Sequence, residues 1–114
     1  MAKEKDYYFS KDELKQFGNI TEFQQEMGRD FFNWYGNVMA EGALTSREKA
    51  LIALAVAHAI QCPYCIDAYS DGCLQHGAAE EEMMEAVHVA AAIKAGTTLV
   101  YGVQMMNHVK GKMM

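Results

Sequence analysis

Residues 47–69 read REKALIALAVAHAIQCPYCIDAY, and this stretch decides the fold. Positions 50–60 are apolar on nearly every side of a helix, which predicts a central, buried helix. Thr45 or Ser46 is expected to cap this helix, because a side-chain oxygen there accepts a hydrogen bond from an otherwise unpaired backbone N–H. Glu48 follows in the first turn, where its charge suits the positive end of the helix dipole.

The second half of the stretch predicts a turn and a new helix. Pro63 is the only proline in the chain, and it fits the first helical position after a cap at Cys62. Gly77 is expected to close that helix, because glycine commonly follows a helix C-terminus. The two central helices are then expected to form an antiparallel hairpin around Gln61.

The residues before the central stretch are rich in aromatic side chains. Ser10 is predicted to cap a short helix that ends near Phe17. Asn19 or Thr21 is predicted to cap a second helix, which runs to about Ala40. The apolar face of that helix follows the helical repeat and consists of Phe23, Met27, Phe31, Trp34 with Tyr35, and Val38.

The residues after the hairpin are rich in alanine and methionine. The acidic run Glu80–Glu82 is expected to open a fifth helix to about Lys94, because anions stabilise a helix N-terminus. Gly96 is expected to break the chain before a sixth helix from about Thr97 to Val109. Since no window alternates apolar and polar residues convincingly, the fold is predicted to be all-α, with about six helices and a central helical hairpin.

Length and composition limit the functional class. With 114 residues and a mass of 12.7 kDa, the chain is expected to form one domain over residues 1–114. Its net charge of −5 gives it no general attraction to nucleic acid or to an anionic membrane. The charged start does not fit a signal peptide, and the longest apolar run, residues 50–60, is too short to span a bilayer. We therefore expect a soluble, cytoplasmic protein that binds neither nucleic acid nor membrane.

Cys62 and Cys65 carry the strongest chemical signal in the sequence. Two cysteines separated by two residues at a helix start lie about one turn apart, so their sulfurs can bond to each other. The helix N-terminus carries roughly half a positive charge, which favours the thiolate that attacks a peroxide or a disulfide. The alternative is that both are buried core cysteines, which is less usual for a spaced pair beside a proline. We favour redox chemistry.

His58 lies four residues before Cys62 and shares a helix face with Ala50 and Leu54. In the expected hairpin it lies near the cysteine pair, where it can take a proton from a thiol or give one to a leaving hydroxide. A satisfied core histidine is the alternative. With the two cysteines it also offers three zinc ligands, but no fourth ligand is within reach, so neither a metal nor another cofactor is expected.

The remaining candidate residues are interpreted as structural. Cys73 lies too far along its helix to join the pair in one metal site, and it is expected to be a small buried apolar residue. His88 is expected to be structural and to line the same cavity as His58. His76 and His108 are expected on the surface at helix ends.

Two segments of the chain resemble a known family. Residues 47–58, followed by CPYCID at 62–67, are similar to the carboxymuconolactone decarboxylase superfamily, on its AhpD-like (alkylhydroperoxidase) side. Together with residues 86–92, they most resemble a branch called arsenosugar-biosynthesis-associated peroxidase-like proteins. The resemblance covers roughly residues 30–105.

The resemblance implies an all-α AhpD-like fold that assembles as a trimer or hexamer. An assembly also suits a small chain with this many aromatic and methionine side chains, which is expected to bury a face against its own copies. The resemblance further implies a Cys-x-x-Cys pair that cycles between dithiol and disulfide while it reduces a peroxide. Cys65 is then the attacking residue, Cys62 is the resolving one, and an external dithiol resets the pair.

The chain departs from the AhpD pattern at two positions. The pattern places a glutamate twelve residues before the first cysteine and a histidine four residues after the second, and here Ala50 and Tyr69 occupy them. Because the two positions face each other in a helical hairpin, their joint replacement is physically coherent. His58 is expected to replace the missing base, and Tyr69 can still donate a hydrogen bond.

Three functions remain open from the sequence. The first is a thiol-dependent peroxidase or disulfide reductase that uses Cys65 and Cys62, with His58 as the base and Tyr69 assisting. The second is non-catalytic binding of a small molecule or metalloid by the adjacent thiolates. The third is a decarboxylase or lyase of the same superfamily, acting on a small acidic lactone with His58 or His88 as acid or base.

Overall fold

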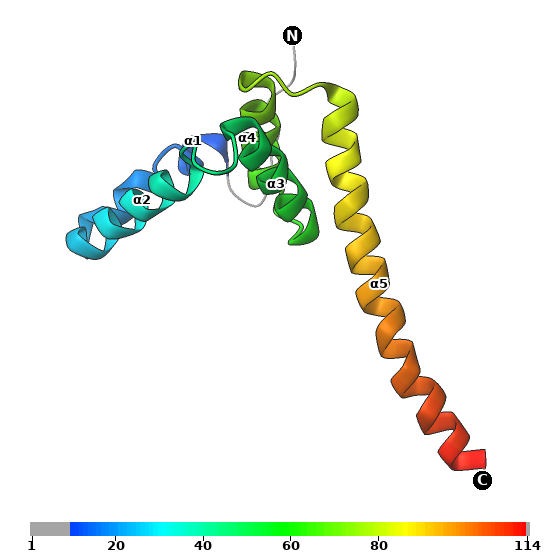
Figure 1. The fold of residues 1–114 in the computed structure, drawn as a ribbon. Coiled ribbons are helices and arrows are strands. Elements are labelled where there is room, and N and C mark those ends of the chain that lie inside the picture. Colours follow the sequence, from blue (N-terminus) through cyan, green and yellow to red (C-terminus); the bar gives the residue numbers. More distant parts are fainter. Residues whose placement is uncertain (1–9, 114) are drawn as a thin grey trace. The chain divides into compact units, whose positions relative to one another are not determined.

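The computed structural model describes residues 10–113, and the regular elements in that part of the chain are all helical (Figure 1). The chain divides into two compact units, with the boundary between Lys49 and Ala50. The prediction of an all-α fold is confirmed. In chain order the described elements are α1 (Lys11–Leu14), the 3-10 helix η1 (Phe17–Glu22), α2 (Gln25–Met39), α3 (Ser46–Ala59), α4 (Pro63–Gln75) and α5 (Glu80–Met113).

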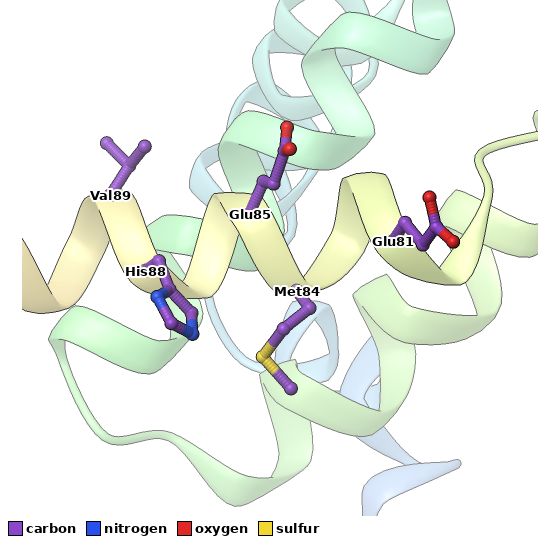
Figure 2. A pocket seen from close by; sticks show the side chains of 5 residues that line it. All are labelled: Glu81, Met84, Glu85, His88 and Val89. Atoms are coloured by element: carbon purple, nitrogen blue, oxygen red, sulfur yellow. The ribbon is translucent and has the colours of Figure 1, made fainter.

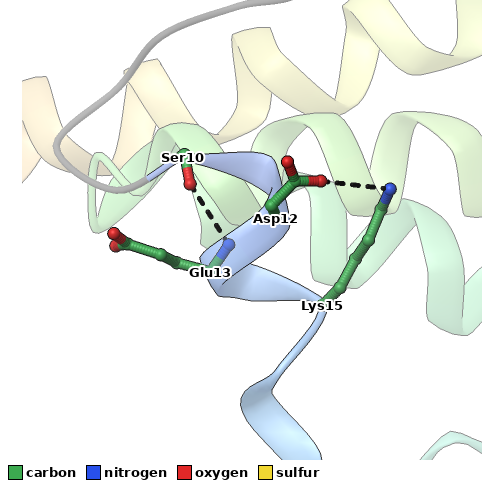
Figure 3. Close-up of polar contacts among 4 residues, drawn as sticks. All are labelled: Ser10, Asp12, Glu13 and Lys15. Atoms are coloured by element: carbon green, nitrogen blue, oxygen red, sulfur yellow. Dashed lines mark hydrogen bonds and ion pairs between the residues drawn. The ribbon is translucent and has the colours of Figure 1, made fainter.

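Ser10 caps α1, as predicted. Its Oγ accepts the backbone N–H of Glu13 at 3.2 Å, as Figure 3 shows. The ion pair between Asp12 and Lys15 spans 3.5 Å, but both side chains are largely exposed to water, so the pair adds little stability. The cap, rather than the ion pair, therefore fixes the start of α1.

The segment between α1 and α2 differs from the prediction. α1 ends at Leu14 rather than near Phe17, because the N–H groups that follow bond three residues back and wind the chain into η1. Asn19 and Thr21 do not cap a helix, since both lie inside η1, where the Thr21 hydroxyl donates to a carbonyl oxygen three residues back. The N-cap of α2 is instead Gln24, in the left-handed region with φ 105°.

The predicted apolar face of α2 is present from Met27 onward, and it is largely open to solvent in the described chain. Phe23, which was predicted to belong to this face, lies before the helix as the C-cap of η1. α2 ends at Met39, one residue before the predicted end. The Phe31 ring packs edge-on against the rings of Phe17 and Phe32, with centroids 6.3 and 5.2 Å away. Trp34 is nevertheless 62% exposed. The aromatic residues of this unit thus form a cluster that is only partly covered.

Gly28 lets η1 and α2 approach each other closely. A Cβ atom at this position would lie 2.9 Å from the Cα atom of Thr21, which is backbone and cannot rotate away. We expect Gly28→Ala to lower the free energy of unfolding by about 1–3 kcal/mol, in spite of the better helix propensity of alanine. Urea unfolding of the purified variant measures the change.

Gly36 provides the matched control in the same helix. A Cβ atom there meets nothing within 4 Å, so Gly36→Ala should stabilise the protein by about 0.5–1 kcal/mol. Equal effects of the two substitutions would contradict the close approach at Gly28.

A reciprocal cap fixes the start of α3. The Thr45 N–H donates to Glu48 Oε1 at 2.9 Å, and the Glu48 N–H donates to Thr45 Oγ1 at 3.1 Å. The hydrogen bond from the Thr45 N–H lowers the pKa of Glu48. The predicted cap at Thr45 is confirmed, and Glu48 serves the cap. Lys49 Nζ in turn donates to the carbonyl oxygens of Val38 and Ala40 at the end of α2.

α3 and α4 form the predicted antiparallel hairpin. Ala50 and Leu54 of α3 cluster with Cys73 near the end of α4 and with Ala78 just after it. The prediction of a wholly buried α3 is wrong within the described chain. Its opposite side remains open, and Ile52 is 50% exposed there, because α4 covers one face only.

Two matching turns end α3 and α4. After α3, the Gln61 N–H donates to the His58 carbonyl at 3.1 Å, and the Cys62 N–H donates to the Ala57 carbonyl at 3.0 Å. This Schellman pattern requires a left-handed residue just after the cap. Gly77 fills that position after α4 with φ 77°, as its predicted closing role requires, whereas Gln61 fills it after α3 with φ 55°. The left-handed conformation costs a residue with a Cβ atom roughly 1–2 kcal/mol.

α5 runs without a break, as Figure 1 shows, and it contains 34 residues. The predicted break at Gly96 and the separate helix from Thr97 are therefore wrong. A glycine inside a helix costs about 1 kcal/mol relative to alanine, which the alanine-rich run before it can offset. Lys94 Nζ donates to the carbonyl oxygen of Ala59 at 2.9 Å and so connects α5 to the end of α3.

The second half of α5 is apolar and uncovered. Of its described residues after Ala90, none is buried. By length and composition alone, α5 could cross a membrane, although core helices of water-soluble proteins pass the same test. The candidate site lies around the turn between α3 and α4, beside the middle of α5, where Lys94 donates to the Ala59 carbonyl.

Candidate functional site

The cysteine pair lies at the N-terminus of α4. Cys62 is the N-cap residue and Pro63 occupies the first helical turn, as predicted. The backbone N–H of Cys65 donates to Cys62 Sγ at 3.3 Å. Both residues are free cysteines of intermediate exposure. A half-buried sulfur that accepts a backbone N–H at a helix N-terminus is well placed to carry negative charge.

Cys65 differs from its neighbour in its electrostatic surroundings. Burial, followed by the thiol hydrogen bond to Cys62, raises the pKa of Cys65 to about 11. In this arrangement Cys65 keeps its proton and shares it with Cys62. The two sulfurs therefore differ, because Cys62 Sγ accepts a hydrogen bond whereas the Cys65 thiol keeps its proton.

This asymmetry predicts an order of alkylation that depends on pH. At pH 7, iodoacetamide should modify Cys62 first and Cys65 slowly, because the thiolate is the reactive form. The rate at Cys65 should rise about tenfold per pH unit until the pH approaches 11, since the thiolate fraction grows at that rate below the pKa. Peptide mass spectrometry after short exposures measures both rates. Equal rates at pH 7 would contradict the assignment.

The ring of His58 is held by its own helix. His58 Nδ1 lies 2.8 Å from the carbonyl oxygen of Leu54. A carbonyl oxygen only accepts, so Nδ1 donates in this contact, and Nε2 is the ring nitrogen left to meet a ligand; in the neutral tautomer that has its proton on Nδ1, Nε2 is an acceptor. The ring lines a cavity of about 190 Å³ between the end of α3 and α5, and neither cysteine is among the described residues that line it.

Gln61 and Lys94 also line this cavity, and sequence reasoning missed both. Gln61 is the residue just before the cysteine pair, in the left-handed position where Gly77 stands in the matching turn. Lys94 is a single cation after an alanine-rich apolar run. The sequence offered two signals for them. One is a glutamine at a turn position that favours glycine, and the other is a single charge in an apolar helix.

Tyr69 and Ala50 belong to the hairpin core. Ala50 is 3% exposed and forms part of the buried cluster, against which the Tyr69 side chain packs. Burial raises the pKa of Tyr69, so its hydroxyl keeps its proton. The two positions that carry acid–base residues in the AhpD pattern are therefore part of one apolar contact region in this chain.

The other candidate residues lie apart from the pair. Cys73 is 0% exposed, which confirms that it is a small buried residue, and burial raises its pKa. His76 and His108 are exposed, as predicted. The expectation that His88 lines the same cavity as His58 is wrong, because His88 is exposed and lines a separate hollow along α5.

The hollow at His88 does not form a metal site in the described chain. It is lined by Glu81, Met84, Glu85 and Val89 besides the histidine. Figure 2 shows the two carboxylates turned away from the His88 ring. Among the residues that the structure describes, no three His, Cys, Asp or Glu side chains gather closely enough to hold a metal ion.

The model of the carboxymuconolactone decarboxylase family matches residues 25–107. The chain belongs to this family. This confirms the resemblance at the level of the superfamily, while its AhpD-like side and the arsenosugar branch remain predictions.

A relative of this family member occurs in Paracoccus denitrificans, under the name "Uncharacterized protein 4 in cox locus". The two are 48% identical over 64 residues, which is 56% of this chain and 58% of that protein. The match thus spans less than two thirds of the relative's length.

Solved structures of similar chains agree with the fold. A protein from Methanobacterium thermoautotrophicum is 35% identical, with a TM-score of 0.71 over 75% of this chain and 97% of that one. The apo form of a carboxymuconolactone decarboxylase family protein from Legionella pneumophila is 31% identical, with a TM-score of 0.68 over 82% and 83%. A Thermotoga maritima protein, 24% identical with a TM-score of 0.56 over 84% and 94%, shares the fold alone.

Proposed function

We propose that this member of the carboxymuconolactone decarboxylase family is a thiol-dependent peroxidase or disulfide reductase that uses Cys62 and Cys65. The observation that carries the proposal is the placement of both sulfurs at the start of α4, with the Cys65 N–H donated to Cys62 Sγ. Both thiols are partly exposed, so a small oxidant can reach them. Such a pair supplies the two electrons that a peroxide or a disulfide accepts.

The proposed cycle reduces one peroxide and oxidises the two thiols to a disulfide. A thiolate attacks one peroxide oxygen, the O–O bond breaks, and the leaving alkoxide takes a proton to become an alcohol. The resulting sulfenic acid condenses with the second thiol to form a disulfide and water. An external dithiol then exchanges with this disulfide, which returns the pair to its reduced form while the partner is oxidised.

The order in which the sulfurs act is part of the proposal. The family resemblance assigns the attack to Cys65 and the resolving step to Cys62. The hydrogen bonds favour the reverse, because Cys62 Sγ accepts a backbone N–H while burial and Cys62 together raise the pKa of Cys65 to about 11. We therefore propose Cys62 as the first nucleophile and Cys65 as the resolving thiol.

His58 and Tyr69 have supporting roles in this proposal. The acceptor atom His58 Nε2 takes a proton from the bound oxidant or returns it to the leaving group, rather than acting on a sulfur directly. The protonated Tyr69 hydroxyl is a hydrogen-bond donor in the hairpin. We propose both as assistants to the cysteine pair.

Thiol counting tests the proposed function. The reduced wild-type protein is exposed to tert-butyl hydroperoxide, and free thiols are titrated against time. We expect the loss of two thiols for each peroxide consumed, with recovery after addition of dithiothreitol. The Cys62→Ser/Cys65→Ser variant should lose thiols only at the slow rate of the buried Cys73. Equal rates in both proteins would contradict the proposal.

A lyase acting on a small acidic lactone is the second candidate, and family membership favours it. His58 would then act as the acid or base. Its activity would survive in the Cys62→Ser/Cys65→Ser variant, whereas peroxide reduction would not. Assaying carboxymuconolactone loss with that variant separates the two candidates.

We further propose that the protein works as a homo-oligomer, a trimer or a hexamer, in the cytoplasm. Support comes from large apolar side chains that the described chain leaves open on three helices. They include Trp34, Ile52, Val56, Leu99, Val100, Tyr101 and Met105. Light scattering at micromolar concentration measures the mass of the assembly, and a monomer would contradict this part of the proposal.

A further inference from the structure

We propose that the cavity between the end of α3 and α5 binds a small molecule that carries both a carboxylate and an O–H group. The inference rests on the proposed function in one respect: in a thiol peroxidase, this molecule is the hydroperoxide substrate. The cavity volume of about 190 Å³ is below the ~300 Å³ at which pockets for drug-sized ligands begin, so the ligand is small.

His58 supplies the acceptor for the O–H group. Its Nδ1 proton is donated to the Leu54 carbonyl at 2.8 Å, so that Nε2 is the acceptor in the neutral tautomer with the proton on Nδ1. The ring lines the cavity, so a hydroperoxide or hydroxyl group inside can donate to it.

Lys94 supplies the charge that selects a carboxylate. One of its three N–H donors goes to the Ala59 carbonyl, which leaves two for a ligand. Among the described residues that line the cavity, none is acidic. Val87, Ala90 and Ala91 also line the cavity and bring no charge that competes with an anion for Lys94.

Gln61 has a side chain at a backbone position where glycine would be less strained. It adopts φ 55° in a turn whose counterpart uses Gly77, so glycine would relieve the strain. Gln61 lines the cavity, and a side-chain amide at this position can both donate and accept. Strain of this kind persists where the side chain has a role, and here that role is to hold the ligand.

The cavity and the cysteine pair are adjacent along the chain. Gln61 lines the cavity, and the next residue is Cys62, whose N–H is fixed to the Ala57 carbonyl at 3.0 Å. The turn that shapes the cavity therefore also fixes the backbone of the first cysteine. Substrate binding and thiol chemistry would thus share one rigid turn.

Binding is tested without any redox step in the Cys62→Ser/Cys65→Ser background. The probe is β-hydroxyisovalerate, which has one carboxylate and one hydroxyl group and resembles the reduced form of a small acidic hydroperoxide. We expect one molecule to bind per chain by calorimetry, with a shift of the His58 ring resonances by NMR. Absence of binding at millimolar probe would overturn the inference.

Three variants in that background show which side chains hold the probe. Lys94→Met should weaken binding about tenfold or more, the effect of losing one charged hydrogen bond, while Lys94→Arg restores most of the affinity. Neutral tert-butanol should bind equally weakly to all of them. Gln61→Gly should raise the unfolding temperature and weaken binding together, which a purely structural residue would not do. Unchanged affinity in Lys94→Met would overturn the inference.

A kinetic comparison connects the cavity to the proposed function. In the wild-type protein, β-hydroperoxyisovalerate should oxidise the thiol pair about tenfold faster than tert-butyl hydroperoxide, and Lys94→Met should remove the preference. If the probe binds as expected but neither peroxide oxidises the pair, the proposed function is wrong and the binding site stands. If both peroxides oxidise the pair at equal rates, the cavity is not the substrate site.

Discussion

Replacing Cys62 by serine should slow the first oxidation step about tenfold or more, whereas replacing Cys65 by serine should stop the cycle one step later. The reason is the hydrogen bond from the Cys65 N–H to Cys62 Sγ, together with the raised pKa of Cys65. With one equivalent of hydroperoxide at pH 7, Cys65→Ser should accumulate a sulfenic acid on Cys62. Cys62→Ser should react about tenfold or more slowly, because the remaining thiol is mostly protonated.

Dimedone trapping followed by peptide mass spectrometry reads out both variants. Cys73→Ala is the control. In this variant the Cys62–Cys65 pair should be oxidised at the wild-type rate, because Cys73 is 0% exposed and lies in the hairpin core. A sulfenic acid that forms on Cys65 in Cys62→Ser, but not on Cys62 in Cys65→Ser, would contradict the order proposed for the pair. It would support the order that the family resemblance implies.

Ala50→Glu should cause the largest loss of stability of any single substitution considered for this chain. It restores the glutamate of the AhpD pattern, but Ala50 is 3% exposed in an apolar cluster with Leu54 and Cys73. An unpaired buried carboxylate is expected to lower the free energy of unfolding by about 3–5 kcal/mol at pH 7. Urea unfolding measures the loss.

The pH dependence of this variant identifies the cause. Burial would raise the pKa of the new carboxyl group above its unfolded value, so the folded state binds the proton more tightly. The loss of stability should therefore be full at neutral pH and shrink as the pH falls toward 4. Ala68→Glu, on an exposed position of α4, is the control and should change stability by less than about 0.5 kcal/mol. A loss at Ala50 that is independent of pH would indicate a steric cause instead.

Local signals in the sequence predicted most helix boundaries. Ser10, Thr45 and Pro63 each mark a helix start by a bond or a ring geometry within one turn, and the structure follows them. The helix break predicted at Gly96 is absent, because whether a glycine ends a helix depends on the helix propensity of all its neighbours. The same holds for the burial of α3, which depends on how many partners cover it.

The sequence predicts where the two cysteines lie on the helix, but it does not predict which other side chains lie around the cavity beside them. The spacing of Cys62 and Cys65 fixes their relation to the helix start, whichever way the rest of the chain folds. The pairing of Lys94 with the end of α3 joins residues 35 positions apart, and no local pattern encodes it. The direction of the His58 ring likewise follows from one bond to the Leu54 carbonyl, which a helical repeat does not specify.

Peptide mapping of the oxidised protein tests the central claim most directly. The reduced chain is treated with one equivalent of hydroperoxide, free thiols are blocked, and the peptides are identified by mass. The proposed cycle predicts a chain that has lost two hydrogen atoms, with a Cys62–Cys65 disulfide and a blocked, unoxidised Cys73. An unchanged mass, or a product in which Cys73 is oxidised while the pair stays reduced, would contradict it.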